Sequence, residues 1–208
     1  MFILCLTGSI GMGKSTAAAL LRRQGVWVHD ADAAVHRLFA KGGAAVPLIA
    51  QAFPQAVVNG EVDRTILGRL VLGDPTALRR LEAIVHPLVR RSTDRFLAAA
   101  ARARQPLVVL DIPLLFETGG QSRCDGIVVV SAPLFLQMQR VLRRPGMTPA
   151  KLAAILTRQM PDREKRRRAD WVVTSAFGKG CTGRQLAAVI RKARRQRGRV
   201  WRPGYSRQ

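Results

Sequence analysis

The sequence has few cysteines, few acidic residues and no long hydrophobic segment. Its three cysteines, Cys5, Cys124 and Cys181, are scattered, odd in number and never spaced as a C-x-x-C pair. This pattern argues against a disulfide framework and against a cysteine metal site, so we expect core or surface thiols in a reducing cytoplasm. No apolar stretch approaches the ~20 residues of a membrane-spanning helix, and the start of the chain lacks the basic leader of a signal peptide.

The charge is strongly one-sided. The chain carries 35 Lys and Arg against 13 Asp and Glu, a formal net charge of +22, and only six of the cations are lysines. Such a balance favours polyanionic partners, either nucleic acid or phosphorylated small molecules, although coding bias toward Arg and Ala produces it as well. The cations are dense in residues 191–208. We interpret this stretch as a solvated helix end with a frayed basic tail, because no base-reading motif accompanies it, and non-specific binding to nucleic acid is the alternative.

Near the N-terminus an apolar run leads into a glycine-rich stretch. Phe2–Thr7 has the character of a buried strand, residues 8–15 read Gly-Ser-Ile-Gly-Met-Gly-Lys-Ser, and residues 15–23 have a helical pattern. The middle stretch fits G-x-x-x-x-G-K-[ST], the phosphate-binding loop, or P-loop. Strand, loop and helix in this order are the context that the motif requires. The alternative, an ordinary glycine-rich turn, does not need the lysine and the hydroxyl that follow it.

The residue types of this loop suit a nucleoside triphosphate. Backbone N–H groups of a glycine-rich turn and of a helix start converge on an anion. Lys14 can reach the β- and γ-phosphates of ATP, and the Ser15 hydroxyl can bind Mg²⁺. The ATP-binding residues predicted from the motif are Gly11, Met12, Gly13, Lys14, Ser15 and Thr16.

The rest of the chain alternates apolar runs with helical patterns. Strands are predicted at 26–29, 107–111, 126–130 and 171–173, and helices at 33–39, 133–142 and 149–156. Strands rich in Val, Ile and Leu that are separated by helices predict one α/β domain, a P-loop-type parallel sheet covered by helices on both faces.

Two segments interrupt this alternation. Residues 47–104 contain no convincing strand, so we expect a helical insertion over the ends of the sheet, where open α/β folds bind ligands. Within it, Asp74-Pro75 predicts a helix start, and Pro87 should kink or restart the helix that follows. Residues 143–168 carry many arginines and are expected to form a mobile lid of the kind that closes over ATP in small kinases.

Acids and one arginine complete the predicted site. Asp32 follows the second strand and is our candidate for the base that orients the nucleophile, with Asp30 as the competing choice, since one of the two should cap the next helix. Asp111 ends the third strand and is a candidate Mg²⁺ ligand, directly or through water. Arg140 is the downstream arginine expected to contact phosphate.

At this level of detail the sequence resembles the dephospho-coenzyme A kinase family. The resemblance extends from the first strand to about Gly183. The segments that carry it are Leu6–Ser15, Asp30-Ala31-Asp32, His86-Pro87-Leu88, Asp111–Glu117, Gln137-x-x-Arg140, Gln159, Glu164-Lys165 and Ala169-Asp170.

The resemblance implies transfer of the ATP γ-phosphoryl group to the 3′-hydroxyl of dephospho-CoA, giving coenzyme A and ADP in the last step of coenzyme A biosynthesis. It implies Asp32, Lys14 and Arg140 as catalytic residues, and His86, Pro113, Leu114 and Glu117 as residues that bind the acceptor. The insertion would form the acceptor-binding part, and helices within 149–168 the lid. We expect a monomer that acts on this small molecule and on no membrane.

Two departures from the family pattern affect the nucleotide end of the site. Residues 174–178 read Thr-Ser-Ala-Phe-Gly where the family usually has Asn followed closely by Gly near the adenine, and Pro145 replaces an acid after Arg144. Two other functions fit part of the sequence. A nucleoside monophosphate kinase would share the loop and lid but not the acceptor segments, and an ATP-dependent nucleic-acid-binding protein would use the +22 charge but lacks motor and base-stacking motifs.

Overall fold

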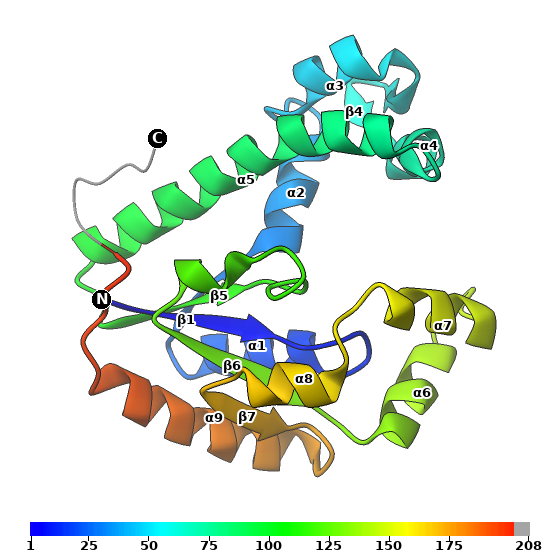
Figure 1. The fold of residues 1–208 in the computed structure, drawn as a ribbon. Coiled ribbons are helices and arrows are strands. Elements are labelled where there is room, and N and C mark those ends of the chain that lie inside the picture. Colours follow the sequence, from blue (N-terminus) through cyan, green and yellow to red (C-terminus); the bar gives the residue numbers. More distant parts are fainter. Residues whose placement is uncertain (202–208) are drawn as a thin grey trace. The chain divides into compact units, whose positions relative to one another are not determined.

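The computed structural model of the chain describes residues 1–201 and divides into two compact units. The first unit contains Met1–His29 and the chain from Ala99 onward, and the second contains Asp30–Ala98. Figure 1 gives the element labels used below. The end of the predicted basic tail, residues 202–208, lies outside the described residues.

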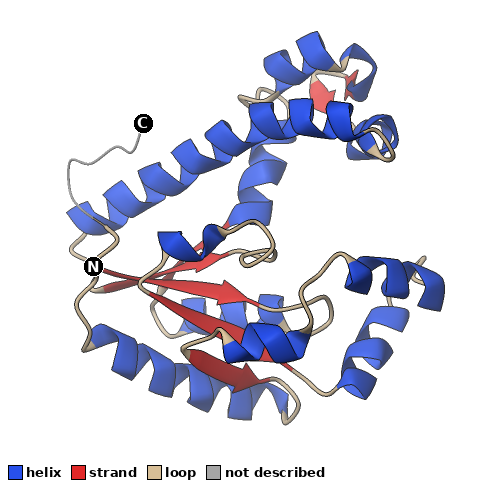
Figure 2. Ribbon diagram, viewed as in Figure 1, coloured by secondary structure: helices blue, strands red, loops and turns tan. Residues whose placement is uncertain are grey.

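The first unit is built on a five-stranded sheet in the order β2-β5-β1-β6-β7 (Figure 2). The strands are β1 (Phe2–Thr7), β2 (Trp27–Asp30), β5 (Leu107–Asp111), β6 (Gly126–Ser131) and β7 (Trp171–Thr174). β1 pairs in parallel with both β5 and β6, and β6 pairs in parallel with β7. The predicted α/β class, the parallel sheet and all five of its strands are confirmed.

Helices and one short 3₁₀ turn complete this unit: α1 (Lys14–Arg23), η2 (Gly120–Arg123), α6 (Leu134–Leu142), α7 (Pro149–Thr157), α8 (Asp162–Arg167) and α9 (Gly178–Arg194). Alternate residues of β1, Phe2, Leu4 and Leu6, share a buried cluster with Leu21 of α1 and Leu186 of α9. α1 and α9 therefore cover one face of the sheet, as Figure 1 shows. None of the helices within residues 1–201 has the length and apolar character that crossing a bilayer requires.

The second unit is mainly helical. It contains α2 (Ala31–Phe39), α3 (Val46–Ala52), η1 (Pro54–Ala56), β3 (Val57–Val58), β4 (Glu61–Val62), α4 (Arg64–Val71) and most of α5 (Pro75–Arg102). Its core gathers Phe39, Ile49, Phe53 and Leu67. The expectation that this region lacks strands was wrong, because β3 and β4 form a small antiparallel hairpin. Asn59 and Gly60 make its turn with φ values of 53° and 81°.

The helix α5 passes through Pro87 without a break. The predicted start at Asp74 is confirmed, because its carboxylate accepts hydrogen bonds from the Thr76 and Ala77 N–H groups at 2.8 and 3.0 Å. Of the two outcomes predicted for Pro87, the restart is wrong because the helix is continuous, while the kink stays a prediction. Leu81 and Ile84 before the proline and Leu88 after it all pack on the core of the second unit, and this burial outweighs the loss of one backbone hydrogen bond.

The cysteines also differ from expectation. Cys5 of β1 and Cys124, which precedes β6, form a disulfide with a Cα–Cα distance of 5.7 Å, while Cys181 is a free thiol. The prediction that all three remain thiols is therefore wrong for this pair. The bond joins the strand that leads into the P-loop to a residue 119 positions later in the chain.

Residues 191–201 are part of the first unit. α9 continues to Arg194, and Ala193 is fully buried in the core. Beyond the helix, the N–H groups of Arg199 and Val200 both donate to the Asp125 carboxylate, which also accepts from the N–H of Ile3. The expected solvated helix end is confirmed by the exposed Arg191, Lys192 and Arg194, whereas the expected frayed tail is wrong for Arg199 and Val200.

Candidate active site

The P-loop leaves β1 at Thr7 and enters α1 at Lys14, as the motif predicts. Two of its glycines have backbone conformations that favour glycine, with φ of 76° at Gly11 and 92° at Gly13. Space is also restricted there. A Cβ atom on Gly11 would lie 2.5 Å from Cγ2 of Val141, and one on Gly13 would lie 3.0 Å from Oγ of Ser175. Neighbouring elements therefore pack directly against the loop backbone.

The start of α1 suits an anion. Its N-cap is Gly13, which supplies no side-chain hydrogen bond to the first turn, and the first turn contains no acidic residue. The N–H groups of such a helix start carry a partial positive charge. The Met12 N–H, in contrast, is used inside the loop, where it donates to the Ser9 carbonyl at 3.1 Å.

Lys14 and Asp111 meet at the end of the sheet. The Lys14 Nζ lies 2.8 Å from Asp111 Oδ1, and the aspartate side chain is only 2 % exposed. β1 and β5 are neighbours, so the lysine that follows one strand reaches the acid that ends the other. The structure therefore brings together two residues that the sequence assigned to phosphate and to Mg²⁺.

The oxygen ligands available here fit Mg²⁺. This ion usually takes one or two protein oxygens and fills its other positions with water and substrate phosphates. Asp111 supplies a carboxylate, and Ser15 places an exposed hydroxyl in the first turn of α1. Among residues 1–201 no three His, Cys, Asp or Glu side chains cluster as a metal site, so any ion held here depends on few protein ligands.

Arg140 of α6 is bound to the loop that follows β7. Its Nη1 donates to Ser175 Oγ and its Nη2 to the Ser175 carbonyl, both at 2.8 Å, and Nη1 also lies 3.4 Å from the Gly11 carbonyl. Ser175 in turn donates its hydroxyl to the Met12 carbonyl at 2.7 Å. In the sequence alone, Ser175 is only a departure from the family pattern. In the structure it links Arg140 to the P-loop.

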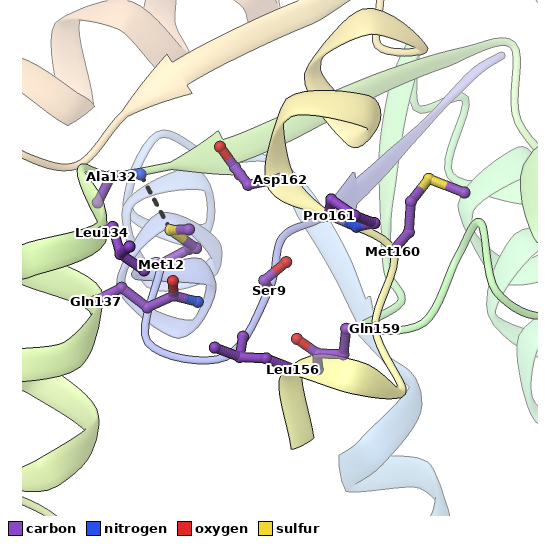
Figure 3. A pocket seen from close by; sticks show the side chains of 10 residues that line it. All are labelled: Ser9, Met12, Ala132, Leu134, Gln137, Leu156, Gln159, Met160, Pro161 and Asp162. Atoms are coloured by element: carbon purple, nitrogen blue, oxygen red, sulfur yellow. Dashed lines mark hydrogen bonds between the residues drawn. The ribbon is translucent and has the colours of Figure 1, made fainter. Parts of the chain in front are cut away.

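A cavity of about 330 Å³ lies beside the P-loop. Figure 3 shows the side chains that line it, which are Ser9, Met12, Ala132, Leu134, Gln137, Leu156, Gln159, Met160, Pro161 and Asp162. The Met12 side chain turns toward β6, where its sulfur accepts a hydrogen bond from the Ala132 N–H at 3.1 Å. Asp162 is fixed by the Ser131 hydroxyl at 2.7 Å. The wall of the cavity is therefore formed by the P-loop, α6 and the segment from α7 to α8.

The predicted acceptor residues Pro113, Leu114 and Glu117 lie in the turn after β5. The Pro113 carbonyl accepts from the Thr7 hydroxyl at 3.0 Å, and Leu114 is exposed. Glu117 binds Lys165 of α8 at 2.8 Å and accepts from the Met160 N–H at 2.8 Å. Burial raises the pKa of Glu117. The hydrogen bonds from Lys165 and from the backbone lower it by a larger amount, so the net pKa is below its ordinary value.

Asp32, Asp30 and His86 belong to the second unit. Asp30 caps α2, since its Oδ1 accepts from the Ala33 N–H at 2.9 Å. Asp32 lies in the first turn of the same helix and is exposed, and His86 is an exposed residue of α5. Of the two competing acids, Asp30 is therefore the one with a capping role.

Comparison with known proteins shows the family of the chain. The family "Dephospho-CoA kinase" matches residues 2–178. A dephospho-CoA kinase from Mesorhizobium japonicum is 56% identical over 95% of this chain and 100% of its own length. One from Paramagnetospirillum magneticum is 68% identical over 80% of this chain and 78% of its own.

Solved structures agree in fold. A protein from Thermus thermophilus, 42% identical, covers 92% of this chain and 97% of its own with a TM-score of 0.80. A dephospho-CoA kinase from Campylobacter jejuni, 21% identical, covers 92% and 96% with a TM-score of 0.62. The latter likeness concerns the fold alone. With the family matched across most of its length, the resemblance inferred from the sequence is confirmed, and the chain belongs to the dephospho-CoA kinase family.

Proposed function

We propose that this protein transfers the γ-phosphoryl group of ATP to the 3′-hydroxyl of dephospho-CoA. In this reaction the hydroxyl oxygen forms a bond to the γ-phosphorus, the bond from that phosphorus to the β–γ bridging oxygen breaks, and ADP leaves. The observation that carries the proposal is the P-loop with its Lys14–Asp111 pair in a chain of this family. Catalysis of this kind depends mainly on positioning and on stabilisation of phosphate charge.

We assign the nucleotide phosphates to the P-loop. Backbone donors from Gly11 and from Gly13 to Thr16 would surround the β-phosphate, and Met12 would shape the loop through its buried side chain. Lys14 would move from Asp111 to the phosphates when ATP binds, leaving the aspartate and Ser15 to hold the Mg²⁺ that screens phosphate charge. Arg140 adds a fixed positive charge 3.4 Å from the Gly11 carbonyl.

Asp32 is the residue we assign to the acceptor hydroxyl, whose proton it would accept. The assignment is supported by its exposure and by the capping role that occupies Asp30. Positioned bases of this kind contribute about 10²–10⁴-fold in rate. His86, Pro113, Leu114 and Glu117 are assigned to the acceptor pocket. Residues 47–104 are assigned to acceptor binding and residues 143–168 to the lid.

The test is ADP release from Mg·ATP with dephospho-CoA, AMP, other nucleotides or duplex DNA, followed by the mass of the product. We expect turnover with dephospho-CoA alone and a product heavier by one phosphoryl group. Transfer to another nucleotide, or hydrolysis stimulated by DNA, would refute the assigned acceptor.

We further infer a monomer in the cytoplasm, where ATP is supplied. Light scattering should then give a mass close to 22.8 kDa. A mass twice as large would refute the monomer, and cell fractionation tests the location.

A further inference from the structure

Two glutamines hold the same residue of the P-loop. The Gln137 Nε2 donates to the Ile10 carbonyl at 2.8 Å, and the Gln159 Oε1 accepts from the Ile10 N–H at 3.1 Å. A backbone carbonyl only accepts and a backbone N–H only donates. The chemistry of Ile10 therefore fixes which end of each amide faces it.

The glutamines come from different elements. Gln137 is a buried residue of α6, 3 % exposed, and Gln159 lies between α7 and α8. Both side chains line the cavity beside the loop in Figure 3. The chain between them, residues 138–158, contains Arg140 and α7. The two ends of this segment are thus fastened to a single P-loop residue.

The hydrogen bond to the Ile10 carbonyl also sets the direction of a phosphate donor. In a planar trans peptide, the carbonyl of one residue and the N–H of the next point in opposite directions. When Gln137 fixes the Ile10 carbonyl, it turns the Gly11 N–H the other way. Ser175 orients the peptide between Met12 and Gly13 in the same way. Its hydroxyl donates to the Met12 carbonyl at 2.7 Å and thereby sets the direction of the Gly13 N–H.

We propose that Gln137 and Gln159 are positioning residues for nucleotide binding, which hold the peptides around Ile10 so that the Gly11 N–H is oriented for the β-phosphate of the nucleotide. Gln137 acts as a hydrogen-bond donor and Gln159 as an acceptor. The inference rests on the assignment of residues 8–15 as the ATP site. It adds two side chains that act through the P-loop backbone. Gln159 belongs to residues 143–168, which are assigned to the lid, and Gln137 belongs to α6, which precedes them.

The opposite polarity of the two bonds gives a sharp test. Gln137→Glu keeps the size of the side chain but replaces the donor with a second acceptor that repels the Ile10 carbonyl. Gln159→Glu keeps an acceptor for the Ile10 N–H, whereas Gln159→Leu removes it. Gln139→Glu, at an exposed position of α6, adds the same charge two residues from Gln137 and controls for electrostatics.

The readout is the dissociation constant of Mg·ADP by calorimetry. We expect Gln137→Glu to raise it about tenfold or more, because an acceptor is left unpaired, and Gln139→Glu to raise it less than about threefold. Gln159→Leu should weaken binding about three- to tenfold, and Gln159→Glu should recover most of that loss. In turnover, KM for ATP should rise in Gln137→Glu while KM for dephospho-CoA stays within about twofold, a split that a general loss of stability would not produce.

Equal affinities of the Gln137→Glu and Gln139→Glu proteins would overturn the proposal. If Gln137→Glu does not fold, the two Gln159 variants decide, and equal affinities of both with the wild type would overturn it. A wild-type protein that binds no Mg·ADP would refute the ATP site itself and this inference with it. Wild-type binding that none of the glutamine changes affects would refute the inference alone.

Discussion

Lys165 Nζ lies 2.8 Å from Glu117 Oε1, and the lysine side chain is completely excluded from solvent. Glu117 follows β5 and Lys165 lies in α8, so the pair joins the turn after a central strand to the second helix of the segment assigned to the lid. The Met160 N–H donates to the same carboxylate oxygen. One carboxylate therefore anchors both the start of α8 and its buried lysine.

Removal of one member of this pair should be costly. We expect Lys165→Met to lower the free energy of unfolding by about 1–3 kcal/mol, because it leaves the partly buried Glu117 carboxylate without its cation. The double variant Glu117→Gln with Lys165→Met should recover part of this loss, since no charge is left unpaired. Chemical denaturation measures both. Arg166→Met, an exposed change on the same helix, is the control and should cost no more than about 0.5 kcal/mol. A Lys165→Met protein as stable as this control would contradict the prediction.

The effect of Glu117 should depend on pH. Burial raises its pKa, the hydrogen bonds from Lys165 and the backbone lower it by more, and the folded-state pKa is below its ordinary value. A carboxyl group with a lowered folded-state pKa stabilises the protein fully above its unfolded pKa of about 4.3, and this stabilisation is lost as the pH falls through the folded-state value. The gap in unfolding free energy between wild type and Glu117→Gln should therefore be present at pH 7 and shrink below about pH 4. A gap that widens on acidification would be inconsistent with this sign.

The disulfide predicts a thiol count. Titration of the denatured protein without reductant should find one thiol, Cys181, and titration after reduction should find three. Cys124→Ser should lower the free energy of unfolding of the oxidised protein by about 2–5 kcal/mol, because the bond closes a long loop in the unfolded chain. Cys181→Ser is the matched control and should leave the oxidised protein's stability nearly unchanged. Three thiols before reduction would rule out the bond.

The two acids at the start of α2 should behave differently. Asp32→Asn should lower kcat about 10²–10⁴-fold with little change in stability, because the carboxylate is assigned to the acceptor hydroxyl. Asp30→Ala should instead lower the free energy of unfolding by about 0.5–2 kcal/mol, because it removes the cap that accepts from the Ala33 N–H. Steady-state kinetics and thermal denaturation of both variants separate the roles. If Asp30→Asn lowers kcat more than Asp32→Asn does, the acceptor hydroxyl must be assigned to Asp30 instead.

Lys14→Ala should abolish measurable turnover, with a loss of kcat of at least about 10²–10³-fold, because the phosphates lose their closest cation. Circular dichroism should show that the fold is retained. Lys192→Ala, an exposed lysine on α9, is the control for removal of one positive charge. Turnover near that of the wild type in Lys14→Ala would refute the phosphate role.

The sequence was sufficient for features that are local or periodic. The strands of the main sheet, the P-loop and the capped start of α5 each have a complete signal within a few residues. The hairpin of β3 and β4 was missed because strands of two residues are too short to show alternation. The continuity of the helix through Pro87 could not be decided from the sequence, because it depends on packing against the second unit's core, which propensity does not include.

Pairs that are distant in the sequence could not be predicted. Ser175 and Met12 are 163 residues apart, and Cys5 and Cys124 are 119 apart, so only the folded sheet brings each pair together. The same holds for Lys165, which belongs to a family motif but has no role that the sequence shows, because its partner Glu117 is 48 residues away in the chain. The residue types of the site were visible in the sequence, whereas their partners were not.

The Asp125 carboxylate binds the backbone of both Ile3 and Val200, and this contact makes circular permutation of the chain feasible. The first strand and the last described residues are held at one side chain, so a short peptide can join the two ends of the described chain. The new termini can be placed in the Asn59–Gly60 turn, because both residues are solvent-exposed and connect the two short strands of a hairpin. In a circularly permuted protein that begins at Gly60, Cys124 and α6 would precede the joining peptide, and Cys5 and the P-loop would follow it.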